Sequence, residues 1–167
     1  MSNANCQTEA INDTLHWNEN RELAMSDFKG ETLEFTGLMG EAFCMMTANF
    51  ERPTVFSKTT FKVYAIFDKK KSWVSLKEKD DNVLFYFQVM FNLYELHARE
   101  LRKDLSETRF GLDPNSVFQE KYNASMTELT NDFNEFRKDT KMGLDNNALM
   151  TWNKKVHDSL KILENYK

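Results

Sequence analysis

One stretch of the chain, residues 82–105, constrains the fold more than any other. It reads NVLFYFQVMFNLYELHARELRKDL and contains neither proline nor glycine. Its second half is rich in strong helix formers, whereas its first half is almost entirely apolar. We therefore predict one long helix. Because the first half is apolar nearly all round, we expect this helix to lie inside the domain.

A narrow polar stripe runs along the predicted helix. At about 100° per residue, the polar side chains of the stripe fall on one side of the helix. They are Gln88, Asn92, Glu95, Arg99, Arg102 and Ser106. Glu95 can pair with Arg99 one turn later or with Arg102 two turns later. We interpret Glu95 as a structural ion-pair partner rather than a catalytic acid.

The same stretch resembles the zinc-site helix of a bacterial family of proposed zinc-dependent proteases, otherwise of unknown function. That family reads roughly L-L-x-H-E-Q-x-H-F-D-L-x-E-L-x-A-R. The matching positions here, with Asn92 where Asp is usual, are Leu84, Gln88, Phe91, Leu93, Glu95, Leu96, Ala98 and Arg99. The residues at the metal-binding positions differ from those of the family. The two His positions hold Tyr86 and Met90, and the Glu position holds Phe87.

The substitutions matter because of what the family motif does. Two imidazoles four residues apart hold Zn²⁺, while the glutamate takes a proton from the metal-bound water. Tyrosine and methionine are poor zinc ligands, and phenylalanine cannot act as a base. The resemblance therefore implies a protease scaffold without the protease chemistry.

Two other segments carry the same resemblance, which spans about residues 17–152. An early family pattern, W…R-x-L-x-W-x-D-F-x-G, is matched with Met25 in place of the second Trp at Trp17, Arg21, Leu23, Asp27, Phe28 and Gly30. A later pattern, Y-D-x-x-T-x-H-G followed by Trp, is matched at Phe136, Thr140, Gly143 and Trp152. Met142 stands at its His position. The resemblance thus implies a zincin-like metalloprotease scaffold with vestigial zinc-site positions at Tyr86, Phe87, Met90 and Met142.

The rest of the chain predicts an α+β fold, a small antiparallel sheet packed against three long helices. We expect strands at 9–17, 41–51 and 58–68, and a short helix or turn within 21–30. In the third strand, Phe61, Val63, Ala65 and Phe67 share one face. Lys69–Lys71 is expected to be a solvated turn, and residues 72–74 a short extended piece that also matches the family.

Two more helices follow the central one. The first begins after Asp113 and Pro114, where Ser116 and Gln119 have the spacing of a capping box, and the second covers about 146–166. Gly143 separates the two helices. We interpret residues 1–8 as a cloning remnant or a disordered N-terminus, and residues 9–167 as a single zincin-like domain.

Other candidate sites are weaker. His16, His97 and His157 lie too far apart in sequence to pair on one helix face, and His97 lies about 10 Å along the axis from Met90. Met90 and Met142, with Met45 and Met46, have the thioethers that bind Cu(I), but we interpret them as core residues. A polar site made of Gln88, Glu95, His97 and Arg99 is the alternative. We predict no catalytic residues, no metal and no cofactor.

The charge and composition of the chain limit the classes of partner that it can bind. A net charge of −4 offers no basic field for nucleic acid. No apolar run reaches the ~18 residues of a transmembrane segment. Cys6 and Cys44 can form one disulfide or remain free thiols. Two cysteines do not indicate the cellular compartment of the protein. Cys6 lies where the lipid-attachment site of an exported envelope protein would be if a leader had been removed.

The leading functional prediction is a pseudo-enzyme, a non-catalytic homologue of the zinc-dependent proteases. It would bind a peptide or protein ligand at the old cleft or serve a structural role. Two alternatives stay open. One is an active hydrolase with a rebuilt site that uses Glu95 and His97. The other is an envelope-associated protein-interaction module.

Overall fold

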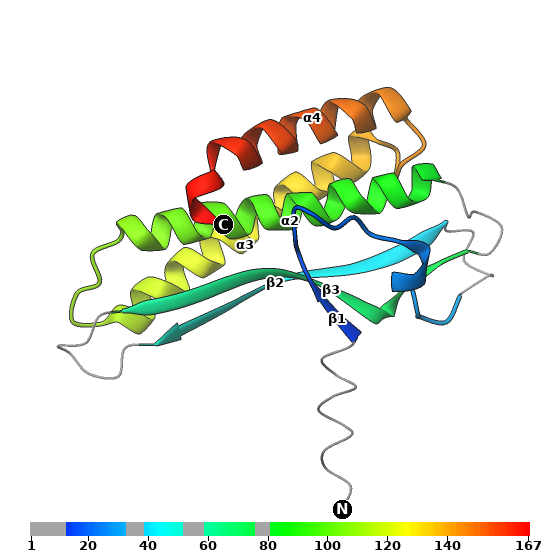
Figure 1. Ribbon diagram of the computed structural model, residues 1–167. Coiled ribbons are helices and arrows are strands. Elements are labelled where there is room, and N and C mark those ends of the chain that lie inside the picture. Colours follow the sequence, from blue (N-terminus) through cyan, green and yellow to red (C-terminus); the bar gives the residue numbers. More distant parts are fainter. Residues whose placement is uncertain (1–12, 33–38, 52–58, 76–80) are drawn as a thin grey trace, which may run out of the picture.

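A three-stranded antiparallel sheet packs against three helices, so the α+β class is confirmed (Figure 1). The computed structural model describes residues 13–32, 39–51, 59–75 and 81–167. The strands are β1 (Thr14–His16), β2 (Gly40–Glu51) and β3 (Thr60–Val74). The helices are α2 (Asp81–Glu107), α3 (Pro114–Asp139) and α4 (Asn146–Ile162), with short 3-10 turns η1 (Met25–Asp27) and η3 (Glu164–Tyr166).

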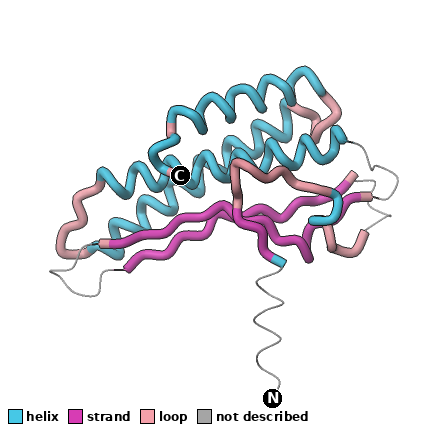
Figure 2. Tube along the Cα trace, viewed as in Figure 1, coloured by secondary structure: helices cyan, strands magenta, loops and turns pink. Residues whose placement is uncertain are grey.

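The sheet has the order β1-β3-β2, with β3 in the middle (Figure 2). Leu15 of β1 and Cys44 of β2 both face Phe67 of β3 in the register. Val63, Ala65 and Phe67 are buried, as their alternation predicts, because this face packs on the helices. On the opposite face, the side chains of Phe43, Met45 and Tyr64 are exposed.

Strand β3 is longer than predicted, and the prediction of a turn at Lys69–Lys71 was wrong. These lysines and residues 72–74 continue β3. A register shift against β2 lies here, between the pairs Phe43–Asp68 and Glu41–Trp73. The Asp68 carboxylate accepts hydrogen bonds from the Lys70 and Lys71 amides, both at 3.1 Å. The polar run therefore marks a bulge in the strand rather than its end.

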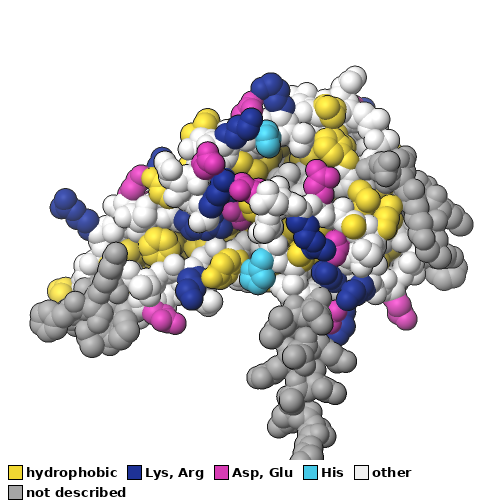
Figure 3. Space-filling model, in the orientation of Figure 1, with side chains coloured by type: hydrophobic (Ala, Val, Ile, Leu, Met, Phe, Trp, Pro, Cys, Tyr) yellow, Lys and Arg dark blue, Asp and Glu magenta, His cyan; other side chains and the backbone are white. Residues whose placement is uncertain are grey.

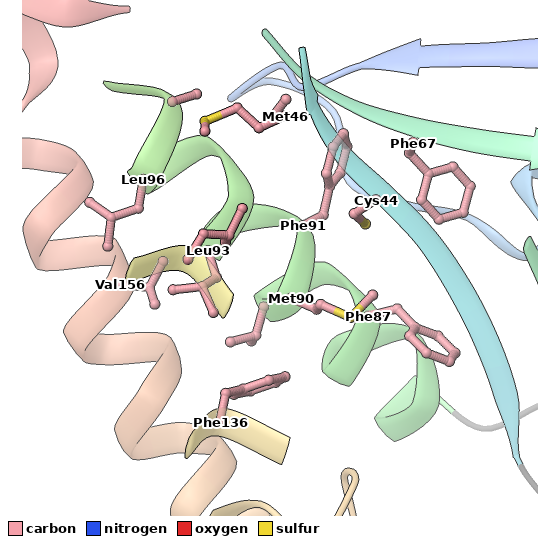
Figure 4. Close-up of a cluster of buried hydrophobic side chains, with 14 of the residues drawn as sticks. Cys44, Met46, Phe67, Phe87, Met90, Phe91, Leu93, Leu96, Phe136 and Val156 are labelled. Carbon is pink, nitrogen blue, oxygen red and sulfur yellow. The ribbon is translucent and has the colours of Figure 1, made fainter. Parts of the chain in front are cut away.

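Helix α2 is the centre of the domain, as its apolar first half predicts. It contacts β3 on one side and both α3 and α4 on others. Figure 4 shows Phe91 and Phe87 directed toward the sheet, while Phe136 of α3 lies below Met90. Phe67, Val89, Leu93 and Phe136 are at most 1% exposed, so the core is continuous from the sheet through α2 to α3.

The other two helices begin at aspartate caps. Asp113, not the predicted Ser116–Gln119 box, caps α3, because its carboxylate accepts from the Ser116 amide at 3.1 Å and Pro114 fills the first turn. Asp145 caps α4 by accepting from the Ala148 amide. Helix α4 ends at Ile162, and the η3 turn completes the predicted span to Tyr166.

The N-terminal predictions are tested only in part. Of the strand predicted at 9–17, residues 14–16 form β1. The proposed N-terminal remnant at 1–8 and Cys6 lie outside the described residues. Cys44 is buried, and burial raises the pKa of its thiol. Within the described ranges, the helices do not include one long and apolar enough to cross a membrane.

Candidate functional site: a polar groove along α2

The positions that match the family's zinc motif lie in the packed core. Tyr86, Phe87 and Met90 are 6%, 4% and 3% exposed. Tyr86 stacks on Phe136 of α3 with 5.0 Å between ring centroids and an angle of 12° between planes. Phe87 contacts Phe28 at 5.4 Å. Burial raises the pKa of the Tyr86 hydroxyl, against the opposing effect of the Arg137 charge.

The fourth position lies in the turn between α3 and α4. Gly143 packs on Tyr86 so closely that a Cβ there would be 3.0 Å from the Tyr86 ring. The structure therefore places the turn after α3 directly against Tyr86 of α2. Met142 itself is exposed, with φ 58°, and its Sδ lies 3.6 Å from Arg137 Nη2.

These residues do not fit a zinc ion. They offer a phenol, a thioether in the core and a thioether at the surface, and none of these replaces imidazole. Across residues 13–32, 39–51, 59–75 and 81–167, no three His, Cys, Asp or Glu side chains are grouped to hold a metal.

The other side of α2 is polar, and it holds the N-terminal segment in place. Trp17 Nε1 donates to Asn92 Oδ1 at 2.8 Å, and Gln88 Nε2 donates to the same oxygen at 2.8 Å. Gln88 Oε1 accepts from the Leu23 amide at 2.7 Å. Two donors on one oxygen fix the orientation of the Asn92 amide, which leaves its Nδ2 facing away from both.

One turn further along, three charged side chains form a compact network. Arg99 Nε donates to Glu95 Oε1 at 3.0 Å, and Arg102 contacts both Glu95 oxygens at 3.1 Å. Arg99 Nη1 also donates to the Leu160 carbonyl of α4 at 2.7 Å. The sequence predicted that Glu95 pairs with Arg99 or with Arg102, and in the structure it pairs with both. Arg99 and Glu95 are buried, at 2% and 3% exposure, and the Trp17 ring lies 5.1 Å from Arg99 Cζ.

A groove of about 840 Å³ opens above this polar side of α2. One wall is the N-terminal segment from Trp17 to Leu23, and the other is the end of α4. Figure 3 shows that acidic and basic side chains are mixed on the face where the N-terminal segment crosses α2. Glu19 and Lys167 span this opening with an ion pair of 2.6 Å. That hydrogen bond from Lys167 lowers the pKa of Glu19 against the opposing effect of desolvation.

His97 does not belong to this site. It is 2% exposed and faces α3, where its Nε2 lies 3.2 Å from Asp132 Oδ2. Its Nδ1 lies 3.2 Å from Glu100 Oε2 without the geometry of a hydrogen bond. The predicted polar site therefore divides. Gln88, Glu95 and Arg99 share one side of α2, and His97 lies on another.

A smaller groove, of about 550 Å³, adjoins the first across the Glu19–Lys167 pair. Its lining includes His16, Tyr64, Glu95 and Arg102. The rings of His16 and Tyr64 meet edge to face at 5.1 Å. Glu95 lines this groove, but both of its carboxylate oxygens already accept hydrogen bonds from guanidinium groups.

Two parts of the groove were missed from the sequence. Trp17 was identified as a motif residue, but not as the partner of Asn92. The α4 wall, with Asn153, His157 and Lys161, was not identified from the sequence, which predicted only that a helix covers these residues. Their spacing of four residues is a signal that they share one face, but it does not reveal what that face meets.

We compared the chain with family models, curated proteins and solved structures. No family model, no curated protein and no solved structure matches it. The resemblance to the zinc-dependent proteases stays a prediction from the residues quoted above, and the α+β fold is established by the structure itself.

Proposed function

We propose that this protein is a non-catalytic homologue of zinc-dependent proteases, with a zincin-like scaffold, and that it works as a binding protein. The groove along α2 carries this proposal. Its aromatic, amide and guanidinium groups are held in fixed positions before any ligand arrives, through the hydrogen bonds of Trp17, Asn92 and Arg99. Preorganised polar groups beside apolar walls are typical of ligand sites.

The titratable groups near α2 favour binding over catalysis. A general base needs a proton acceptor within reach of the substrate. Both Glu95 oxygens already accept hydrogen bonds from arginine. His97 contacts Asp132 on α3 instead of the groove. The rebuilt-hydrolase alternative requires Glu95 and His97 to converge in one pocket, and it gains no support from this arrangement.

The first test is metal content and peptide cleavage of the purified protein. After incubation with zinc and removal of the excess, we expect less than about a tenth of an equivalent of bound zinc. We expect no metal-dependent peptide cleavage. Near one equivalent of zinc, or metal-dependent peptide cleavage by the purified protein, would contradict the proposal and return the protein to the hydrolases.

A second test addresses the zincin resemblance. The triple variant Tyr86→His/Met90→His/Met142→His places three imidazoles where the family pattern has its ligands. If the scaffold is zincin-like, this variant binds zinc at a 1:1 ratio in a competition assay with a chelator. The double variant Tyr86→His/Met90→His, with two imidazoles, is the matched control and binds more weakly. A triple variant with a native circular dichroism spectrum and no zinc affinity above the double variant would contradict the resemblance.

A further inference from the structure

Among the described residues that line the groove, Arg99 is the only charged side chain contributed by α2. One carboxylate, Glu95, is shared between two guanidinium groups, Arg99 and Arg102. Arg99 is 2% exposed, so its charge is poorly screened by water. At the rim, Glu19 and Glu164 are both bonded to Lys167, at 2.6 and 3.1 Å. An anion bound at Arg99 would meet a guanidinium group whose ion-pair partner, Glu95, is shared with Arg102.

Two hydrogen-bond donors on the floor are available to such an anion. Among the described residues, Arg99 Nη2 and Asn92 Nδ2 have no hydrogen-bond partner. In the described ranges, the side-chain nitrogen and oxygen atoms that are fully buried and have no hydrogen-bond partner are His97 Nδ1 and Ser125 Oγ. The two donors are not among these fully buried atoms. Arg99 Nη2 and Asn92 Nδ2 therefore reach the groove, which both residues line. A guanidinium edge is well matched to a carboxylate.

The opposite end of the groove is apolar. Leu84 and Phe85 line it and are only half-buried. They precede Arg99 by about 20 Å along the helix axis at 1.5 Å per residue. A ligand that uses both ends is therefore elongated, with its charge at one end.

We propose that the groove binds an elongated apolar carboxylate, with its carboxylate at Arg99 and its apolar part against Leu84 and Phe85. This inference rests on the binding function proposed above and names its ligand class. Two sources share this chemistry. They are the free C-terminus of an extended apolar peptide, which covers about 17 Å in five residues, and a fatty acid.

Isothermal titration calorimetry with four probes tests the proposal. The probes are dodecanoate, acetate, the acetylated pentapeptide Gly-Ala-Val-Leu-Phe with a free C-terminus, and the same peptide as its amide. We expect dodecanoate or the free-acid peptide to bind with a Kd of about 1–100 μM. Acetate and the amide should bind at least tenfold more weakly. Whichever carboxylate binds more tightly identifies the source.

Three results would overturn the proposal. They are an amide that binds as tightly as the free acid, acetate that binds as tightly as dodecanoate, or no binding of any probe at about 1 mM.

Variants locate the binding site. Arg99→Lys keeps the charge but loses the planar fork, and we expect at least tenfold weaker binding. Because Arg99 also holds α4, a second variant avoids the network. Leu84→Glu places a carboxylate at the apolar end, and we expect tenfold weaker binding with unchanged folding. Leu112→Glu, the same change at a residue 97% exposed elsewhere, should bind like the wild type. Equal binding by all three variants would place the ligand outside this groove.

Failure of the two proposals can be told apart. Zinc binding or metal-dependent cleavage would overturn the non-catalytic function, even if the carboxylate probes bind. A protein without metal or cleavage that binds none of the probes would overturn the ligand class alone.

Discussion

The two sides of helix α2 are both buried, but one side is apolar and the other is charged. On one side, Tyr86 and Met90 are packed against α3, and Tyr86 stacks on Phe136 at 5.0 Å. On the other side, Glu95 and Arg99 are equally buried but charged. An apolar core side is the expected solution, whereas buried ions cost free energy unless they are fully paired. On α2, the costly buried ion pair therefore lies on the side that faces the groove, where Arg99 also holds α4 through the Leu160 carbonyl.

The largest expected effect comes from breaking the charged side. Glu95→Ala leaves Arg99 and Arg102 without their shared carboxylate, so we expect the free energy of unfolding to fall by about 4 kcal/mol. Urea denaturation followed by circular dichroism measures this change. Asp104→Ala, on the same helix but at an exposed ion pair with Lys121, is the control and should change stability by less than about 0.5 kcal/mol. Equal effects of the two variants would mean that the buried network contributes no more to the free energy of unfolding than an exposed ion pair does.

The apolar side should respond to lost volume rather than to lost polarity. Tyr86→Ala removes the ring that stacks on Phe136 and supports Gly143, and we expect a loss of about 3 kcal/mol. Tyr86→Phe keeps the ring, and we expect a change below about 1 kcal/mol. The same urea titration measures both variants. A phenylalanine variant as unstable as the alanine variant would show that the hydroxyl has a role that packing does not explain.

The groove wall depends on Asp27, which anchors the N-terminal segment beside α2. Its carboxylate accepts hydrogen bonds from Arg21 and the Ala24 amide and pairs with Lys69 at 3.0 Å. Burial alone would raise the pKa of Asp27, but these partners hold it below its ordinary value. We expect Asp27→Asn to lower the free energy of unfolding by about 2 kcal/mol at neutral pH.

The pH dependence of that difference has a definite sign. A carboxyl with a lowered folded pKa stabilises the protein above its unfolded pKa of about 4 and loses this effect as the pH falls through the folded value. The gap between wild type and Asp27→Asn should therefore be constant from about pH 5 to 8 and narrow below about pH 4. Urea midpoints across this range measure the gap. A gap that persists at lower pH would assign the effect to packing instead of charge.

Local sequence patterns predicted the helices and strands of the domain, but they did not predict the groove. The 3.6-residue period of α2 and the alternation of Phe61, Val63, Ala65 and Phe67 are local signals, and both were confirmed. The bulge in β3 was read as a turn, because Lys69–Lys71 has the polarity of a turn and the pairing with β2 is not visible in sequence. The same limit applies to the stripe on α2. Its spacing places the polar side chains on one side, but only tertiary contacts reveal that Trp17 and Leu160 cover it.

The smallest effect is expected at Met142, the fourth position of the zinc pattern. Met142 has φ 58°, in the left-handed region that costs an ordinary residue roughly 1 kcal/mol. Its side chain is exposed, so little packing offsets that cost. Met142→Gly should therefore raise the free energy of unfolding by about 0.5 kcal/mol, since glycine's greater freedom in the unfolded chain offsets part of the gain.

Thermal denaturation of Met142→Gly beside Gly143→Ala measures this difference. Gly143 has φ 95°, and its added Cβ would meet the Tyr86 ring, so we expect the alanine variant to lose about 2 kcal/mol. Opposite signs at adjacent residues would show that the turn is shaped by its contact with Tyr86 while Met142 only tolerates it. Strained residues are typical of functional sites, and strain that brings no stability at position 142 would support the proposed relationship to zinc-dependent proteases. A Met142→Gly variant less stable than the wild type would instead give Met142 a structural role and weaken that interpretation.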